Sequence, residues 1–273
     1  MAKFLRRFAF ALAVLFVAAY SLFPFVWALI VSFTDPGQGS LLSRFTLVHY
    51  QTILNFEDET YAIFFRSIFN SIVVCGAVTA LSLFLGALAA YALGRYRFRG
   101  QYLLRYVILA MTIFPTIAVL PSLLIRIKSL NAPSDMLELS LVYPLFILPG
   151  IIWYLIAFFE LLPPQIEEAA FVDGATPFQT FVRILLPITL PAIVTQGLLN
   201  FLALLNEYLF ALSFKGNPLE VLVPVALADL RGAGATNNEL MAASIIVTIP
   251  ILLIVLFLQR AIIGETTQGA VKG

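Results

Sequence analysis

Long apolar segments and short polar connections alternate along the whole chain. Six segments of about 20 residues or more contain no charged residue, and a helix of that length crosses the hydrocarbon core of a bilayer. The short segments of alternating polarity that a membrane β-barrel needs are not the pattern here. The sequence therefore predicts an all-α membrane protein with one transmembrane domain over residues 1–273. The six transmembrane helices are expected at residues 8–34, 67–94, 106–125, 139–162, 187–214 and 240–260.

The first apolar segment is expected to stay in the membrane. It follows Lys3, Arg6 and Arg7, as the apolar part of a cleaved signal peptide would, but it remains apolar as far as Phe33. The apolar core of a signal peptide is only about 7–15 residues long. A permanent anchor is therefore predicted.

Composition agrees with a protein surrounded by lipid. Hydrophobic residues make up 61% of the chain and charged residues only 11%, whereas about 25% of the residues in soluble domains are charged. The net charge of +1 gives no basic excess for binding nucleic acid. The single cysteine, Cys75, excludes an internal disulfide.

The basic residues predict how the chain is oriented in the membrane, because Lys and Arg are retained on the cytoplasmic side. They cluster before the first helix and after the second, while the connection between these two helices is acidic. The basic residues are Lys3, Arg6, Arg7, Arg95, Arg97, Arg99 and Arg105, and the acidic ones are Asp35, Glu57, Asp58 and Glu59. With six crossings, both termini are expected in the cytoplasm.

The connection over residues 163–187, cytoplasmic by this count, begins like a short helix. Pro164 is suited to the first helical position, and Glu167 and Glu168 then fall in the first turn, where the helix dipole favours acidic side chains. Gly174 is suited to end this helix in the left-handed conformation. A short helix followed by a sharp turn is predicted.

A second helix is expected directly after that turn. Thr176 is a suitable N-cap, Pro177 fits the first helical position, and Gln179 completes the spacing of a capping box. The connection is thus predicted to be a helical hairpin that leads into the next membrane helix.

A longer motif in the same connection resembles a family signature. Its positions are Glu168, Ala169, Ala170, Gly174, Ile184, Leu186 and Pro187. Their spacing is similar to the Glu-Ala-Ala loop in the permease subunits of bacterial ABC importers. The resemblance implies a coupling helix that docks into a groove on an ATPase subunit. An ordinary amphipathic surface hairpin remains the alternative.

Two further segments narrow the resemblance. Asn206-Glu207-Tyr208-Leu209, followed by Ala211-Leu212, is similar to the fifth-helix motif of carbohydrate-uptake permeases, although Leu205 replaces the usual tryptophan. The tail looks like that of the smaller permease of the maltose and trehalose type, which lacks a large external domain. The tail residues are Gly269, Ala270, Val271, Lys272 and Gly273.

This resemblance implies the composition of a transporter. It would contain a second, different permease subunit, two ATPase subunits that bind ATP and Mg, and an extracytoplasmic sugar-binding protein. The chain itself would bind no cofactor and would lie in a prokaryotic cytoplasmic membrane. Its tail would reach between the ATPase subunits, and the solute would be a di- or oligosaccharide such as maltose or trehalose.

Polar residues in the fifth expected helix form a candidate translocation path. On an ideal helix Gln196, Asn200 and Glu207 lie within about 40° of one another. Asn206, which precedes Glu207 in the sequence, is a further candidate. A carboxylate inside a membrane helix costs about 2.5–3.5 kcal/mol on insertion scales, so Glu207 is expected to face a cavity or a partner. Sugar hydroxyl groups need such hydrogen-bonding side chains once they leave water. The same side chains could instead bond neighbouring helices, and both interpretations stay open.

The sequence lacks the motifs of an ATPase or a zinc enzyme. It has no Gly-Lys pair and therefore no phosphate-binding Gly-x-x-x-x-Gly-Lys loop. Its one histidine, His49, leaves no histidine pair for zinc. A transporter subunit is predicted, without a catalytic or metal site. A permease of the same superfamily for another solute, such as polyamine or phosphate, is the first alternative, and an intramembrane enzyme is a distant second.

Overall fold

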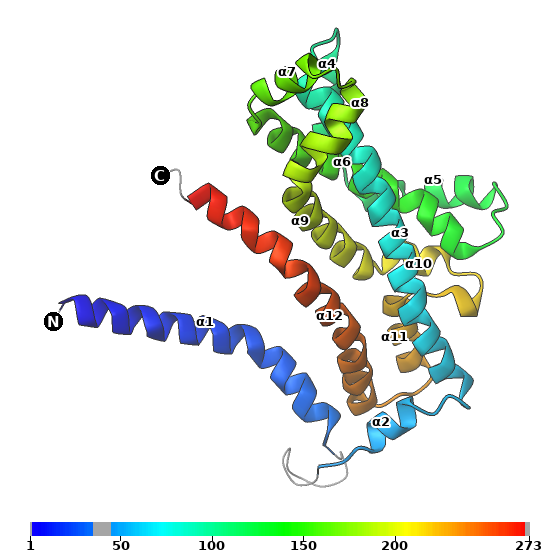
Figure 1. The fold of residues 1–273 in the computed structure, drawn as a ribbon. Coiled ribbons are helices and arrows are strands. Elements are labelled where there is room, and N and C mark those ends of the chain that lie inside the picture. Colours follow the sequence, from blue (N-terminus) through cyan, green and yellow to red (C-terminus); the bar gives the residue numbers. More distant parts are fainter. Residues whose placement is uncertain (1, 35–44, 271–273) are drawn as a thin grey trace. The chain divides into compact units, whose positions relative to one another are not determined.

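The computed structural model describes residues 2–34 and 45–270 (Figure 1). Within these ranges the regular structure is helical, and Thr34 and Phe45 form an isolated antiparallel bridge. In chain order the helices are α1 (Ala2–Ser32), α2 (Val48–Ile53), α3 (Glu59–Arg95), α4 (Gln101–Ile113), α5 (Thr116–Lys128), α6 (Asp135–Leu161), α7 (Gln165–Val172), α8 (Pro177–Thr180), η1 (Phe181–Leu185), α9 (Leu186–Leu205), α10 (Leu209–Phe214), η2 (Pro218–Glu220), α11 (Val223–Gly232) and α12 (Asn237–Ala270).

Five helices in the described part of the chain are long and apolar enough to cross a membrane. They are α1, α3, α6, the continuous path of α8, η1 and α9, and α12. A sixth crossing results if α4 and α5, which are bent by 95° relative to each other, count as one broken span. The prediction of an all-α membrane protein is thereby confirmed, while the cytoplasmic position of both termini stays a prediction.

The third helix is not continuous over residues 106–125, and this part of the prediction is wrong. Phe114 and Pro115 separate α4 from α5 and are extended, with ψ angles of 131° and 103°. A proline disfavours the helical conformation in the residue before it, and its own nitrogen has no hydrogen to donate. Pro121 and Pro191 lie inside helices without interrupting them, so a proline in the sequence does not by itself predict a break.

The fifth helix also departs from its expected range of 187–214. Its helical path starts earlier, at Pro177, and passes through the π-helical turn η1 before α9 begins. It stops at Leu205, and the short α10 follows a break at residues 206–208. Polar side chains in this break hydrogen-bond to nearby backbone groups and so compete with the regular helical bonds. The apolar pattern also did not predict α2 and α11, which are too short to span a bilayer.

The described residues fall into two compact units. One contains the residues up to Phe64 together with Leu227–Ile251, and the other contains Phe65–Ala226 and the residues from Leu252 onward. The single permease domain expected from the sequence stays a prediction.

In the first unit, side chains from α2 and α12 hold the end of α1. Asn238 donates to the carbonyl oxygens of Val31 and Thr34 at 2.9 and 2.7 Å, and so satisfies groups that a helix end leaves unpaired. The ring of His49 is buried, and its Nε2 lies 3.0 Å from the Thr34 carbonyl oxygen. The single histidine therefore has a structural contact here.

The second unit is built around α6, which packs against α4 and α9. Ile151 and Phe159 of α6 are fully buried. Glycines allow close approach: a Cβ on Gly86 of α3 would lie 2.5 Å from the Ile151 side chain, and one on Gly197 of α9 would lie 2.7 Å from that of Leu83. Small residues are typical of such contacts in membranes, where close packing drives helix association.

Candidate coupling and translocation sites

The connection after α6 folds as the helical hairpin that its sequence predicts, with α7 followed by α8 (Figure 1). Glu167 and Glu168 lie in the first turn of α7. Pro164 precedes the helix as its N-cap, one position earlier than expected. The first helix of the hairpin is therefore confirmed, with its start shifted by one residue.

The turn of the hairpin has the predicted geometry. Gly174 has a φ angle of +83°, in the left-handed region. The N–H of Ala175 donates to the Ala170 carbonyl at 2.9 Å, which is the six-residue bond of a Schellman turn. Thr176 and Gln179 then form a complete capping box, with each side chain accepting from the other residue's backbone N–H. Both local predictions are confirmed.

The outer face of the hairpin combines acidic and apolar groups. Glu168 and Ala169 are exposed, whereas Ala170 is buried. Val172 and Phe178 expose 86% and 62% of their surface. Large exposed apolar side chains grouped with polar ones are typical of a surface that a partner covers.

The remaining positions of the Glu-Ala-Ala motif lie where η1 passes into α9. Ile184 and Leu186 are half-buried and Pro187 is exposed, in the first turn of α9. These three residues belong to the helical path between the hairpin and the membrane span, and not to the tip of the hairpin.

Glu207 lies in the break between α9 and α10 and holds the start of α10. Its carboxylate accepts hydrogen bonds from the N–H groups of Phe210, at 3.0 and 3.1 Å, and Ala211, at 3.1 Å. The hydroxyl of Tyr143 in α6 also donates to it, at 3.3 Å. These bonds satisfy two of the N–H groups that the first turn of a helix leaves unpaired. The carboxylate thus fixes both the start of α10 and its contact with α6.

The other candidate path residues lie in α9 or at its end, whereas Glu207 lies in the break that follows. Asn200 donates to the Gln196 carbonyl at 2.8 Å, and both residues are half-buried in α9. Asn206 is exposed and donates to the Leu202 carbonyl at 2.7 Å. Because α9 ends at Leu205, the regular helix that the expected stripe requires does not reach Glu207. The expectation of a continuous helical stripe is wrong at this point.

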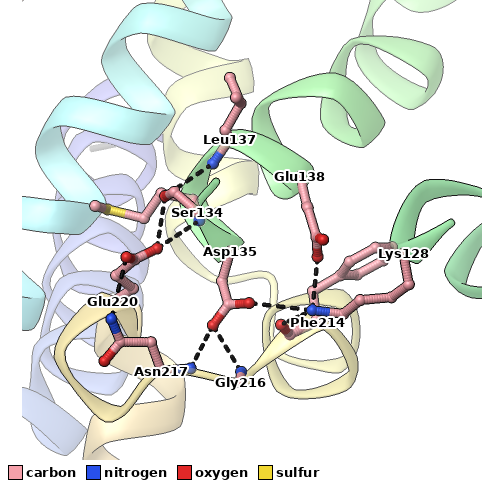
Figure 2. A network of polar contacts seen from close by, with 10 residues as sticks. Lys128, Ser134, Asp135, Leu137, Glu138, Phe214, Gly216, Asn217 and Glu220 are labelled. Atoms are coloured by element: carbon pink, nitrogen blue, oxygen red, sulfur yellow. Dashed lines mark hydrogen bonds and ion pairs between the residues drawn. The ribbon is translucent and has the colours of Figure 1, made fainter. Parts of the chain in front are cut away.

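A polar network joins three elements of the second unit at the far end of α10 (Figure 2). Lys128 at the end of α5 contacts Asp135 and Glu138 of α6 at 3.1 and 2.6 Å. It also donates to the Phe214 carbonyl of α10 at 3.1 Å. Asp135 accepts from two consecutive backbone N–H groups just after α10, at 2.7 and 2.5 Å. The broken third span, α6 and α10 are therefore tied together by charged side chains.

Glu220 extends this network into the turn η2 (Figure 2). It accepts from the Ser134 hydroxyl at 2.6 Å, from the Met136 N–H at 3.3 Å and from the Asn217 side chain at 3.1 Å. The hydrogen bond from Ser134 is the main reason why the pKa of the Glu220 carboxyl lies below its usual range. Sequence reasoning did not find this network, because its members come from separate connections and no local spacing brings them together.

An apolar cavity of about 340 Å³ lies between α3, α9 and α12 in the second unit. Among the described residues that line it, only Thr79 has a polar side chain. A sugar would find too few hydrogen-bonding partners there. The cavity therefore does not fit the expected translocation path.

The predicted tail lies at the edge of the described residues. Gly269 and Ala270 are the last residues of α12, whereas Val271, Lys272 and Gly273 lie outside the described residues. The contact of this tail with ATPase subunits stays a prediction. Among the described residues, no group of three or more His, Cys, Asp and Glu side chains could hold a metal ion.

Residues 82–266, which include the hairpin and the broken fifth span, match the family described as "Binding-protein-dependent transport system inner membrane component". The chain belongs to this family. Its members are membrane components of transporters, so the predictions of a transporter subunit that is not an enzyme, and of a location in the cytoplasmic membrane, are confirmed.

Curated relatives align with this chain over nearly its whole length. The trehalose/maltose transport system permease protein MalG of Thermococcus litoralis is 33% identical over 98% of this chain and 98% of its own length. The trehalose transport system permease protein SugB of Mycobacterium tuberculosis is 34% identical over 94% of each chain. The resemblance to ABC importer permeases of the carbohydrate-uptake type is thereby confirmed.

Solved structures show the same fold. A chain of a bacterial ABC transporter involved in the import of the acidic polysaccharide alginate has a TM-score of 0.80 and 21% identity. The similarity covers 93% of this chain and 96% of that one.

Proposed function

We propose that this chain is one of the two permease subunits of an ABC importer that takes up a di- or oligosaccharide such as trehalose or maltose. The near full-length similarity to the trehalose and maltose permeases, at 33% and 34% identity, is the observation that supports this most. Other relatives are named for sulfoquinovosyl glycerol transport and for diacetylchitobiose uptake. Glycosides as a class therefore have more support than any single sugar.

The importer then contains a second permease, two ATPase subunits that bind ATP and Mg, and an extracytoplasmic sugar-binding protein. The chain offers one hairpin of the coupling type, whereas two ATPase subunits present two docking surfaces. A second permease supplies the second hairpin.

In this proposal the α7–α8 hairpin docks on an ATPase subunit. The small side chain of Ala169 lets the partner's backbone approach, and the adjacent Glu168 is exposed and available for a basic group. Val172 and Phe178 supply apolar surface, whose burial contributes about 25 cal/mol per Å². Gly174 allows the sharp turn that presents both helices to the partner.

The break at residues 206–208 lines part of the sugar path. Non-helical backbone at membrane depth is tolerated where it is buried in protein or lines a cavity, and interrupted helices form the substrate sites of many transporters. The exposed Asn206 side chain supplies a hydrogen-bonding group there, and Gln196 and Asn200 supply others along α9. Glu207 keeps the break in shape through its bonds to α10 and Tyr143.

Reconstitution with the partner subunits tests this function. Calorimetry on the associated binding protein, titrated with trehalose, maltose, diacetylchitobiose, spermidine and phosphate, should show binding of a glycoside only. The loaded binding protein should then stimulate ATP hydrolysis by the complex in lipid vesicles and drive uptake of the same sugar. Binding and uptake of spermidine or phosphate without any glycoside would overturn the sugar assignment. A fully active complex with two copies of this chain and no other permease would overturn the heterodimer.

A further inference from the structure

Arg95, the last residue of α3, is joined to the first turn of α7 by a short ion pair. Its Nη2 and Nε lie 2.6 and 2.7 Å from Oε2 of Glu167. The two side chains are only 9% and 13% exposed. An ion pair with this little exposure is screened less by water and salt than a surface pair. The contact therefore differs from the ordinary exposed pairs of a cytoplasmic loop.

The same guanidinium also caps the end of α6. Its Nη1 donates to the carbonyl oxygens of Leu162 and Phe159, at 2.8 and 3.3 Å. The Leu162 carbonyl belongs to the C-cap of α6, and the Phe159 carbonyl also accepts the Leu162 N–H at 3.3 Å. Arginine is well suited to satisfy carbonyls at a helix end. One side chain thus connects three elements: the end of α3, the end of α6 and the start of the hairpin.

The other end of the hairpin is attached to the same turn of α3. Phe181 follows α8 and is 1% exposed. Its ring is stacked on that of Tyr91, with centroids 5.1 Å apart, and lies 6.1 Å from that of Phe159. Tyr91 and Arg95 are four residues apart and so lie on one face of α3. The start of the hairpin and the residue that follows it are therefore both held by a single turn of α3.

The two consecutive glutamates of α7 consequently differ in their surroundings. Glu167 points into the unit toward Arg95, whereas Glu168 is exposed on the outer face. Neighbouring residues on a helix point about 100° apart, so one turn can contact the bundle with one side chain and a partner with the next.

We propose that Arg95 is a positioning residue: through Glu167 it makes the hairpin and the end of α3 move as one body, so that a displacement of the hairpin is transmitted directly to the α3 membrane span. This inference rests on the proposed role of the hairpin in coupling. It assigns a function to Glu167 that is separate from the partner-facing role of Glu168.

Glu167→Gln and Arg95→Lys test this link in the reconstituted importer. The glutamine keeps the shape but removes the charge, and the lysine keeps the charge but loses the fork that reaches the α6 carbonyls. Both variants should still co-purify with the ATPase subunits, because the outer face of the hairpin is unchanged. The amount of sugar transported per ATP hydrolysed should fall several-fold, since the hairpin is then joined to α3 only by the ring contact of Phe181 with Tyr91.

Glu160→Gln is the matched control. Glu160 on α6 pairs with Arg105 on α4 at 2.6 Å, at the same end of the unit, and within the described part of the chain this pair does not involve the hairpin. This control should keep the wild-type ratio of sugar to ATP.

The outcomes separate this inference from the function on which it rests. If the wild-type chain does not assemble with ATPase subunits, the proposed function fails. If the wild type couples normally and Glu167→Gln and Arg95→Lys keep its sugar-to-ATP ratio, the link between hairpin and α3 is overturned alone. A lower yield or lower Tm with an unchanged ratio also overturns it, because the pair then has only a structural role.

Discussion

Glu207 is half-buried directly after the fifth span, and its surroundings explain how this chain keeps a carboxylate there. Three donors, the N–H groups of Phe210 and Ala211 and the hydroxyl of Tyr143, replace the water that the carboxylate loses. Each bond to a charged group contributes about 1.5–3 kcal/mol. Glu207 thus accepts hydrogen bonds from the N–H groups that the start of α10 would otherwise leave unpaired.

Replacement of Glu207 should therefore affect stability before it affects the sugar. Glu207→Leu leaves two N–H groups of α10 without an acceptor, at a cost of about 1–3 kcal/mol for each buried donor. Glu207→Gln keeps one acceptor oxygen and should cost less. Thermal unfolding of the purified complex in detergent measures the difference, with Tyr143→Phe as a variant that removes only the hydroxyl bond. A wild-type Tm in Glu207→Leu would contradict this account.

Gly174 allows a test of backbone conformation without a change in packing. A Cβ at this position meets no atom within 4 Å, so the φ angle of +83° is the main constraint. A branched side chain in this region costs about 1–3 kcal/mol. Gly174→Val should reduce co-purification of the ATPase subunits and the stimulation of their activity by loaded binding protein.

Gly100 supplies the control for this prediction. It has a φ angle of +88° and equally open surroundings, but it precedes α4. Gly100→Val should cause similar strain and leave the stimulation of ATP hydrolysis intact. Equal loss of stimulation in both variants would show that strain alone, and not the hairpin, is responsible.

At the scale of whole elements, the broken third span depends on contacts far from its break. The extended residues Phe114 and Pro115 leave α5 without helical continuity to α4. Its other end is fixed by Lys128, which contacts two carboxylates of α6 and the last carbonyl of α10. The bend of 95° is therefore held at the end of α5 as well as at the proline.

Lys128→Met should loosen this arrangement. It leaves the carboxylate of Glu138, whose side chain is 5% exposed, without its counter-charge. Loss of one partner costs about 3–5 kcal/mol in a fully buried pair, and the 39% exposure of Lys128 reduces the expected value to about 1–3 kcal/mol. Thermal unfolding should show this loss, and adding Glu138→Gln should restore part of it.

Arg126→Met is the matched control on the same helix, because Arg126 is exposed. A substitution at such a surface position usually changes stability by no more than about 0.5 kcal/mol. An equal loss in the variants of Arg126 and Lys128 would mean that the network contributes no specific stability.

Local signals explain which elements the sequence could predict. The hairpin was predictable because a proline, a glycine and a capping box act within a few residues of one another, and each behaves as expected at Pro177, Gly174 and Thr176. The break after Leu205 has no proline, and one of its polar side chains, Glu207, finds a partner on another helix. The break between α4 and α5 contains a proline, Pro115, but Pro191 lies within the continuous helix α9 and does not interrupt it. Tertiary contacts decide these cases.

For the molecule as a whole, orientation in the membrane is the prediction that awaits a test. The basic connection after α3 should be cytoplasmic, because translocating its arginines is unfavourable. A reporter enzyme that is active only outside the cytoplasm should be inactive when fused after Arg99 or Lys272 and active after Glu57. Activity at Arg99 or Lys272 would contradict the predicted topology.

Long-range pairs were beyond the reach of sequence reasoning at this scale. Arg95 and Glu167 are 72 residues apart, and Lys128 lies 86 residues from Phe214. Each charged residue is visible in the sequence, but the sequence does not indicate which residues contact one another in the fold. The family was recognisable because its motif occupies one connection, at Glu168 to Pro187, whose spacing does not depend on the rest of the fold.

The π-helical turn η1 determines how the hairpin is rotated about the helix axis relative to α9. A π-helix bonds each residue to the fifth one along, so each of its hydrogen bonds closes a segment with one more residue than in an α-helix. Without that extra residue, everything before it would be rotated by about 100° around the axis of α9. The hairpin and the span could each keep their structure, yet the outer face of α7 would point in another direction. If the hairpin has the proposed coupling role, the number of residues between Phe181 and Leu185 thus determines which face of α7 is presented to the ATPase subunit.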